Sequence, residues 1–150
     1  MGPFTTMGRF RVLVVMLGLV AAGCGGSSNA GPSAADVAKV KSTITQALAA
    51  VANGDGATAC SLATTTGQAT LAKLVGSSSC TSAISLLASQ LPPNTKAALR
   101  DAQVKKVSIS GNTATVNNAD ITAPQANIGD LPLPPTVLVK QPDGSWKLNS

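Results

Sequence analysis

The sequence predicts an α+β domain, with its helices first and an antiparallel sheet after them. Between residues 37 and 91, apolar residues recur every three or four positions, which is the spacing of amphipathic helices. After residue 103 the chain becomes rich in β-branched residues that recur at every second position, and this alternation is typical of strands. Helices followed by strands are typical of the α+β class. The length of 150 residues suits one small domain with additional segments.

Residues 1–23 are typical of a secretory signal peptide. Arg9 and Arg11 precede an uncharged apolar run from Val12 to Ala22. This run is shorter than the about 20 apolar residues that a membrane-spanning helix needs. We therefore expect the segment to direct export and to be removed from the mature protein.

The segment Val-Ala-Ala-Gly-Cys at 20–24 resembles the bacterial lipobox, in which small residues precede a cysteine. The resemblance implies cleavage before Cys24, modification of its thiol with diacylglycerol and attachment of the new N-terminus to the membrane. Two or three acyl chains hold a protein on a bilayer stably, whereas one holds it only marginally. We expect a lipoprotein on the extracytoplasmic face of the cell membrane. The alternative is a soluble secreted protein cut at an Ala-x-Ala-like site.

The mature chain divides into a tether and one domain. Residues 25–32 are Gly, Ser, Asn and Pro with one Ala, a composition typical of flexible coil. The lipidated Cys24 and this tether therefore occupy 24–32, and the α+β domain occupies 33–150. Without Arg9 and Arg11 the mature chain keeps nine basic residues against six Asp. This mild positive charge is compatible with contact to an anionic membrane or wall surface.

Cys60 and Cys80 are an even pair in a chain that enters an oxidising compartment. We expect one disulfide between them, closing a loop of about 20 residues and stabilising the fold by roughly 3 kcal/mol. A redox or nucleophilic cysteine would need a C-x-x-C spacing or an activating neighbour, and the chain has no His. Two thiols alone would leave a zinc site incomplete. We therefore expect neither a metal nor a cofactor.

Cap and breaker residues set the expected limits of the helices. Ser33 followed by Asp36 has the form of a capping box, with Asp in place of Glu. Asn53-Gly54 tolerates the left-handed conformation that ends a helix, and Pro92-Pro93 ends the last long one. The expected helices lie at 33–53, 55–62, around 71–76, at 80–91 and, as a short turn, at 95–100.

Turn residues divide the C-terminal part into two hairpins. Gly111-Asn112 separates expected strands at 104–110 and 113–117, and residues 141–144 separate strands at 136–140 and 145–148. Residues 118–135 carry four Pro and are expected to be loop, with at most a short edge strand near Ile121. In the last strand, alternation places Trp146 and Leu148 on one face and Lys147 on the other. We expect Trp146 in the core.

The order of these motifs resembles that of small actinobacterial lipoproteins with a nuclear-transport-factor-2-like (cystatin-like) domain. The resemblance is carried by Asn-Gly-Asp-Gly-Ala-x-Ala-Cys at 53–60, Cys80, Leu-Pro-Pro at 91–93, the hairpin at 104–117 and Asp-Gly-Ser-Trp-Lys-Leu at 143–148. It implies helices packed into the concave side of a bent antiparallel sheet, often around a cone-shaped pocket. It implies no activity, because that fold serves enzymes, carriers and partner domains alike. The Pro-rich stretch at 123–135 departs from a full sheet.

Catalytic chemistry has few suitable residues. Enzymes of this fold use an Asp base with Tyr, His or a second carboxyl group, whereas the mature chain offers Asp without Glu, His or Tyr. Asp36, Asp55 and Asp143 occupy cap or turn positions, and Asp101 lies near the end of an element. Asp120, beside an apolar residue, is the least unfavourable base.

Two functions remain. The first is a membrane-tethered, non-catalytic binding or accessory module of the cell envelope, recognising an envelope protein or a small apolar molecule. The second is a degenerate or atypical enzyme of the same fold with Asp120 as its base. The absence of His, Tyr and Glu favours the first. Nucleic acid is not an expected partner, because Lys105-Lys106 near Arg100 is typical of a solvated face and Trp146 is the single aromatic residue of the mature chain.

Overall fold

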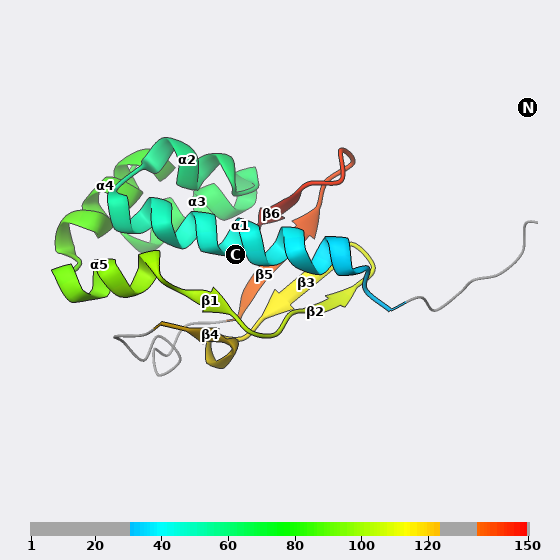
Figure 1. Ribbon diagram of the computed structural model, residues 1–150. Helices are drawn as coiled ribbons and strands as arrows, with labels where there is room; N and C mark the ends of the chain where they lie inside the picture. The colour runs from blue at the N-terminus through cyan, green and yellow to red at the C-terminus, as the bar shows by residue number, and fades with distance from the viewer. Residues whose placement is uncertain (1–30, 124–134, 150) are drawn as a thin grey trace, which may run out of the picture.

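The structure is a computed structural model that describes residues 31–123 and 135–149. Within these residues, five α-helices are followed by two antiparallel sheets, which confirms the predicted α+β class (Figure 1). The expected signal peptide, Cys24 and most of the expected tether lie outside the described residues. So does most of the Pro-rich segment, at 124–134.

Helix α1 (Ala34–Asn53) begins and ends where its cap residues predict. The Ser33 hydroxyl accepts a hydrogen bond from the Asp36 amide at 3.0 Å and caps the N-terminus. Gly54 ends the helix at φ 71°, a left-handed conformation that glycine adopts without steric cost. Val40, Ile44 and Ala47, three or four residues apart, lie on its buried face.

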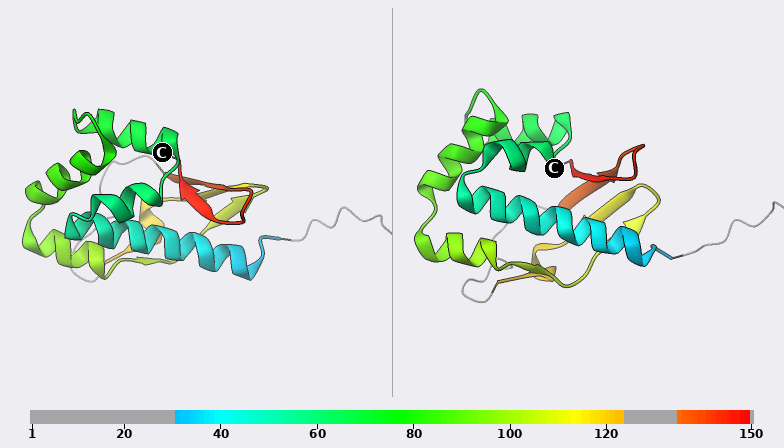
Figure 2. Two further views of the ribbon diagram at one scale, coloured as in Figure 1. Left: turned by 90° about the horizontal axis from the view of Figure 1, so that it is seen from above. Right: turned by 45° about the horizontal axis from the view of Figure 1, so that its top comes forward.

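Four shorter helices gather around the C-terminal half of α1 (Figure 1 and Figure 2). They are α2 (Gly56–Ser61), α3 (Thr65–Leu74), α4 (Cys80–Gln90) and α5 (Pro93–Arg100). α5 begins two residues earlier than predicted, because Pro93 occupies its first position, where the missing N–H costs no hydrogen bond. Side-chain oxygens of Asp55, Thr64 and Ser79 cap the first three of these helices.

The larger sheet has the strand order β2-β3-β5-β6, with each neighbouring pair antiparallel. Its strands are β2 (Ser108–Ser110), β3 (Thr113–Val116), β5 (Thr136–Lys140) and β6 (Trp146–Leu148). Both predicted hairpins are confirmed, and Gly111 and Gly144 take φ values of 57° and 78° in their turns. The smaller sheet pairs β1 (Gln103–Val104) with β4 (Ile121–Thr122).

The strand predicted over 104–110 is wrong in one respect, because the chain divides it into β1 and β2. Residues 105–107 lie outside both strands, and the Lys105 amide donates to the Asp120 carbonyl at 2.7 Å. This interruption allows β1 to pair with β4 while β2 pairs with β3. The pairing of β1 with β4 confirms the short strand predicted near Ile121. Residues Asn118–Asp120 form a 3-10 turn (η1) just before β4.

The main core lies between α1 and the strands (Figure 2). Val40 of α1 and Leu138 of β5 are fully buried, and Trp146 of β6 is 2% exposed. The prediction that Trp146 belongs to the core is therefore confirmed. The other members of this cluster are aliphatic: Ile44, Ala102, Val104, Ala114, Val116 and Ile121.

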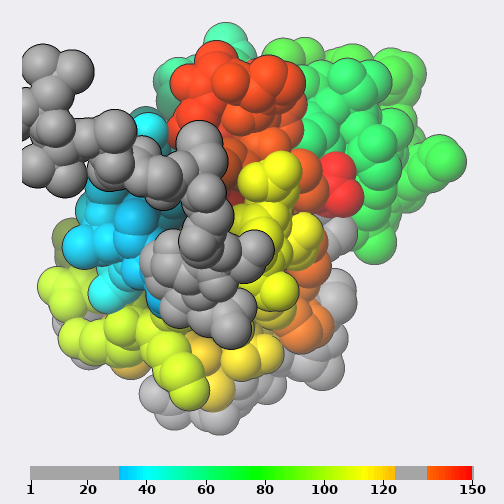
Figure 3. All heavy atoms as spheres, turned by 90° about the vertical axis from the view of Figure 1, so that its right-hand side faces the viewer, coloured from blue at the N-terminus to red at the C-terminus, as the bar shows by residue number. Residues whose placement is uncertain are grey.

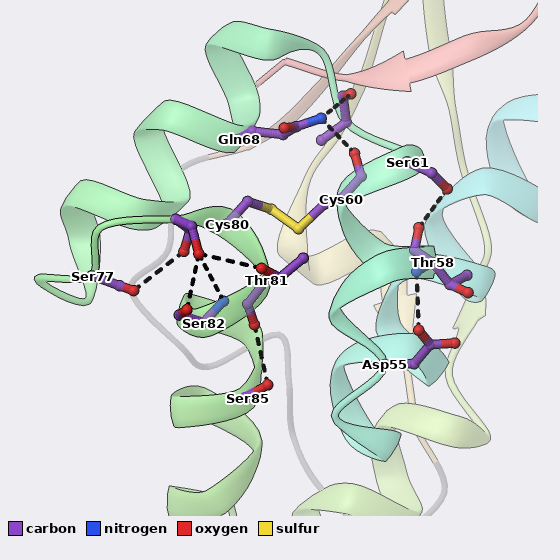
Figure 4. Close-up of a disulfide and its surroundings, with 12 residues drawn as sticks. Asp55, Thr58, Cys60, Ser61, Gln68, Ser77, Cys80, Thr81, Ser82 and Ser85 are labelled. Carbon is purple, nitrogen blue, oxygen red and sulfur yellow. Dashed lines mark hydrogen bonds between the residues drawn. A yellow bond between two sulfur atoms is a disulfide. The ribbon is translucent and has the colours of Figure 1, made fainter.

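A disulfide joins Cys60 on α2 to Cys80 on α4, as predicted (Figure 4). The two Cα atoms are 6.0 Å apart, and both residues are buried. α2 approaches α4 closely because Gly56 has no side chain. A Cβ atom at this position would lie 2.8 Å from the Thr81 carbonyl oxygen. The bridge therefore joins two helices whose backbones already touch.

Candidate functional site

An apolar cavity of about 230 Å³ lies between the helices and the strands. Its walls come from α1, α2, α3 and α4 on one side and from β4, β5 and β6 on the other. The lining residues are Ile44, Ala47, Leu48, Val51, Ala59, Ala63, Gly67, Leu71, Ile84, Ile121, Thr136 and Leu148. Segments that are far apart in the sequence thus meet around one hollow.

Two apolar clusters meet at this cavity. Ile44 belongs to the main cluster between α1 and the strands, which includes Trp146. Ala59 and Ile84 belong to a second cluster, formed around the Cys60–Cys80 disulfide. The disulfide therefore supports the wall of the cavity that α2 and α4 provide.

Small residues create the space inside the cavity. Ala47, Ala59 and Ala63 contribute a methyl group each, and Gly67 contributes no side chain. Gly67 also lets α3 touch the last strand, because a Cβ atom there would lie 2.6 Å from the Leu148 carbonyl oxygen. The same carbonyl accepts a hydrogen bond from the Thr64 amide at 2.7 Å, which fixes the start of α3 to the edge of β6.

The chemistry of the lining suits an uncharged apolar molecule. Among the described residues that line the cavity, no side chain is charged, and Thr136 is the one with a polar side chain. In the described part of the chain, no buried side-chain nitrogen or oxygen lacks a hydrogen-bond partner. A polar ligand would therefore lose hydrogen bonds to water without replacing them. For scale, an apolar cavity of about 150 Å³ stays dry and binds benzene.

A second hollow, of about 480 Å³, lies between α1, the end of α2 and the β5–β6 turn, and most of its lining residues carry polar or charged side chains. Lys39 Nζ donates to the Gly144 carbonyl at 3.1 Å across it. The Asp143 carboxylate accepts from the hydroxyl and the amide of Ser145 at 2.6 and 2.8 Å, and these bonds lower the pKa of Asp143. These polar groups hold the turn in place.

Asp36 makes contacts beyond helix capping. Its carboxylate accepts hydrogen bonds from Lys140 Nζ at 2.9 Å, from Trp146 Nε1 at 3.0 Å and from Ser33 Oγ at 3.0 Å. These bonds, that of Lys140 first, lower the pKa of Asp36 from 3.8 to about 2. The predicted capping box is thus confirmed for the Ser33 hydroxyl, whereas the Asp36 carboxylate is directed mainly to the C-terminal hairpin.

The other acidic residues are spread over the surface of the fold. Asp120, the candidate base, lies in turn η1 and lines neither hollow, and its carboxylate accepts a hydrogen bond from the side-chain Nδ2 of Asn117 at 3.3 Å. Asp55 caps α2, where hydrogen bonds from Thr58 lower its pKa, and Asp101 ends α5. Asp130 lies outside the described residues.

Residues 31–123 and 135–149 contain no group of three or more His, Cys, Asp or Glu that could hold a metal ion. No helix in the same ranges is long and apolar enough to cross a membrane. Comparisons of the chain with protein-family models, with curated proteins and with solved structures found no match.

Proposed function

We propose that this chain is a membrane-anchored envelope lipoprotein whose domain is a non-catalytic binding module for a small apolar molecule. The apolar cavity of about 230 Å³ carries the binding proposal. The lipobox-like segment ending at Cys24 supports a lipid anchor that holds the module at the extracytoplasmic face of the membrane. The order of helices before an antiparallel sheet, with a hollow between them, supports a nuclear-transport-factor-2-like fold.

Binding fits the contents of the cavity better than catalysis does. Ile44, Leu71 and Ile84 offer apolar contact, worth about 25 cal/mol for each Å² removed from water. A proton transfer would need a titratable group within hydrogen-bond reach of the substrate. Asp120 is not among the lining residues, so the enzymatic alternative with this base draws less support from the geometry.

The cavity also favours a small molecule over an envelope protein as the ligand. A protein partner would need an exposed apolar patch or a built polar surface. The large apolar residues that stand exposed in the described ranges are Leu74 on α3 and Leu86 on α4. Single exposed apolar residues are common on protein surfaces and define no interface.

Benzene is a suitable first probe, because it is uncharged and its size suits the hollow. We expect it to bind the mature chain, as seen by ligand-detected NMR, and to raise the unfolding temperature. At ten times the Kd, a ligand that binds only the folded state stabilises it by about 1.4 kcal/mol. For a domain of this size, that shift corresponds to about 5 °C.

Two variants of α1 distinguish benzene binding in the cavity from benzene binding elsewhere on the protein. Ala47→Leu places three extra carbons in the cavity and should abolish the benzene-induced shift. Ala38→Leu makes the same change at an exposed position of the same helix and should leave the shift intact. Equal shifts in both variants, or none in the wild type, would contradict binding in this cavity. Mass spectrometry of a solvent extract of the protein, purified from its own membranes, would then identify the natural ligand.

A further inference from the structure

Six lysines lie on segments that meet at the end of the domain where residues 31–33 lead into α1. Figure 3 faces this end and shows the start of α1 in blue, the β5–β6 turn in orange-red and the β1–β2 connection in yellow-green. The lysines are Lys39 and Lys41 on α1, Lys105 and Lys106 in the β1–β2 connection, and Lys140 and Lys147 on the β5–β6 hairpin. We call this surface the lysine end.

Hydrogen bonds fix these segments to one another. Lys39 Nζ donates to a carbonyl of the β5–β6 turn at 3.1 Å, and Lys140 Nζ donates to the Asp36 carboxylate at 2.9 Å. On the other flank of α1, Lys41 Nζ donates to the Lys105 carbonyl at 3.1 Å. The lysine-bearing segments therefore border the first turns of α1 on both sides.

Acidic residues offset only part of the charge at the lysine end. The six lysines there meet Asp36, Asp120 and Asp143, which leaves a net charge of +3. At the opposite, helical end, three basic residues meet Asp55 and Asp101, which leaves +1. The excess positive charge of the described residues is thus concentrated where the chain enters the domain.

We infer that the lysine end rests on an anionic lipid surface. The inference depends on the proposed lipid anchor at Cys24, because chain geometry then keeps Ser33 within roughly 30 Å of the membrane. Each lysine close to an anionic bilayer strengthens binding by about fivefold. A short tether supplies an effective concentration in the millimolar range, so this weak attraction is enough to orient the domain. The helical end, with its disulfide, then points away from the membrane.

The test uses the mature chain with Cys24→Ser, so that lipid plays no part, and measures co-sedimentation with vesicles. We expect binding to vesicles of phosphatidylglycerol and phosphatidylcholine in equal parts, and none with phosphatidylcholine alone. Lys105→Gln with Lys106→Gln should weaken this binding by about 25-fold at an ionic strength of about 0.1 M. The matched control, Lys73→Gln with Lys96→Gln, removes the same charge from the helical end. It should weaken vesicle binding less than about twofold, because salt at this ionic strength screens the attraction between the bilayer and charges more than about 10 Å from it.

Two outcomes would overturn the inference. Equal weakening of vesicle binding by both double variants, each shown to be folded by circular dichroism, would mean that binding depends on the net charge of the protein and not on the lysine end. If soluble polyphosphate bound as tightly as the anionic vesicles, the lysine end would be a site for anionic polymers and not for a lipid surface. Failure of the anchor or of the cavity is seen separately, by fatty-acid labelling and by the benzene titration, so the proposed function and this inference fail in different experiments.

Discussion

The indole nitrogen of Trp146 lies 3.0 Å from Oδ1 of Asp36 and donates a hydrogen bond to it, although the two residues are 110 positions apart. Lys140 Nζ reaches the other carboxylate oxygen of Asp36 at 2.9 Å and lies 5.8 Å from the centre of the Trp146 ring. One carboxylate in the first turn of α1 therefore fastens both strands of the C-terminal hairpin.

Trp146→Ala should lower the free energy of unfolding by about 3–5 kcal/mol, because it removes a large buried side chain from the core. Urea unfolding followed by circular dichroism measures this change. Trp146→Phe keeps most of the buried apolar volume and should cost clearly less. In the wild type, whose single Trp is 2% exposed, emission should be blue-shifted and poorly quenched by acrylamide. Easy quenching in the folded state would place the ring in solvent.

Asp36 should make the stability of the domain sensitive to acid. Hydrogen bonds from Lys140, Trp146 and Ser33 lower its folded-state pKa from 3.8 to about 2. Because the folded state favours the carboxylate, this contribution is full above pH 3.8 and is lost as the pH falls through about 2. The urea midpoint of the wild type should thus fall more steeply across this window than that of Asp36→Asn. Asp101→Asn, at the end of α5, is the control and should retain the wild-type steepness.

Local signals explain why much of the fold could be predicted. Ser33, Gly54 and Gly144 act on their immediate neighbours, so the limits of α1 and the second hairpin follow from short segments. The interruption at Lys105 could not be predicted, because alternation of residue types does not report which strand a residue pairs with. The partner of the Lys105 amide is the Asp120 carbonyl, in a turn that sequence spacing does not place beside it.

The candidate site was less accessible to sequence reasoning than the fold. Once Cys24 is assigned to the lipid anchor, Cys60 and Cys80 remain as a pair in a chain that is expected to be exported, and the structure contains the disulfide between them. The cavity depends on residues such as Ala63 and Gly67, which contribute by being small and so carry no chemical signal. Their role emerges only when α3 meets the edge of β6. The contacts of Asp36 with the hairpin depend equally on tertiary packing.

Replacing both disulfide cysteines should destabilise the domain. Cys60→Ala with Cys80→Ala opens a loop between residues 20 positions apart, and the chain-entropy model predicts a loss of about 3 kcal/mol for a loop of this length. Thermal unfolding without reductant measures the difference. Addition of reductant should shift the wild type towards the variant and leave the variant unchanged. Two alkylated thiols on freshly exported wild-type protein would contradict the prediction.

Cys24→Ala should abolish retention of the protein in the membrane, because Cys24 is the thiol that follows the small residues of the lipobox-like segment. Growth with a clickable fatty acid should label the wild type and leave the variant unlabelled. Cys60→Ala with Cys80→Ala should keep the label. This control would show that loss of thiols elsewhere in the chain does not prevent fatty-acid labelling. An unlabelled wild type would support the soluble, secreted alternative.

Gly67→Ala should destabilise the domain, although alanine favours a helix over glycine by about 1 kcal/mol. A Cβ atom at Gly67 would lie 2.6 Å from the Leu148 carbonyl oxygen and 3.3 Å from the Asn149 Cα atom, and both neighbours are backbone. To relieve this overlap, α3 must move away from β6, where the Thr64 amide donates to the same carbonyl. We expect a net loss of about 1–3 kcal/mol, typical of overpacking, in urea unfolding. Thr66→Ala, at an exposed position of the same helix, tests helix propensity alone and should be neutral or slightly stabilising. If Gly67→Ala stabilised the domain as helix propensity alone predicts, α3 would not be in backbone contact with β6. The description of the cavity wall that these two elements form would then be wrong.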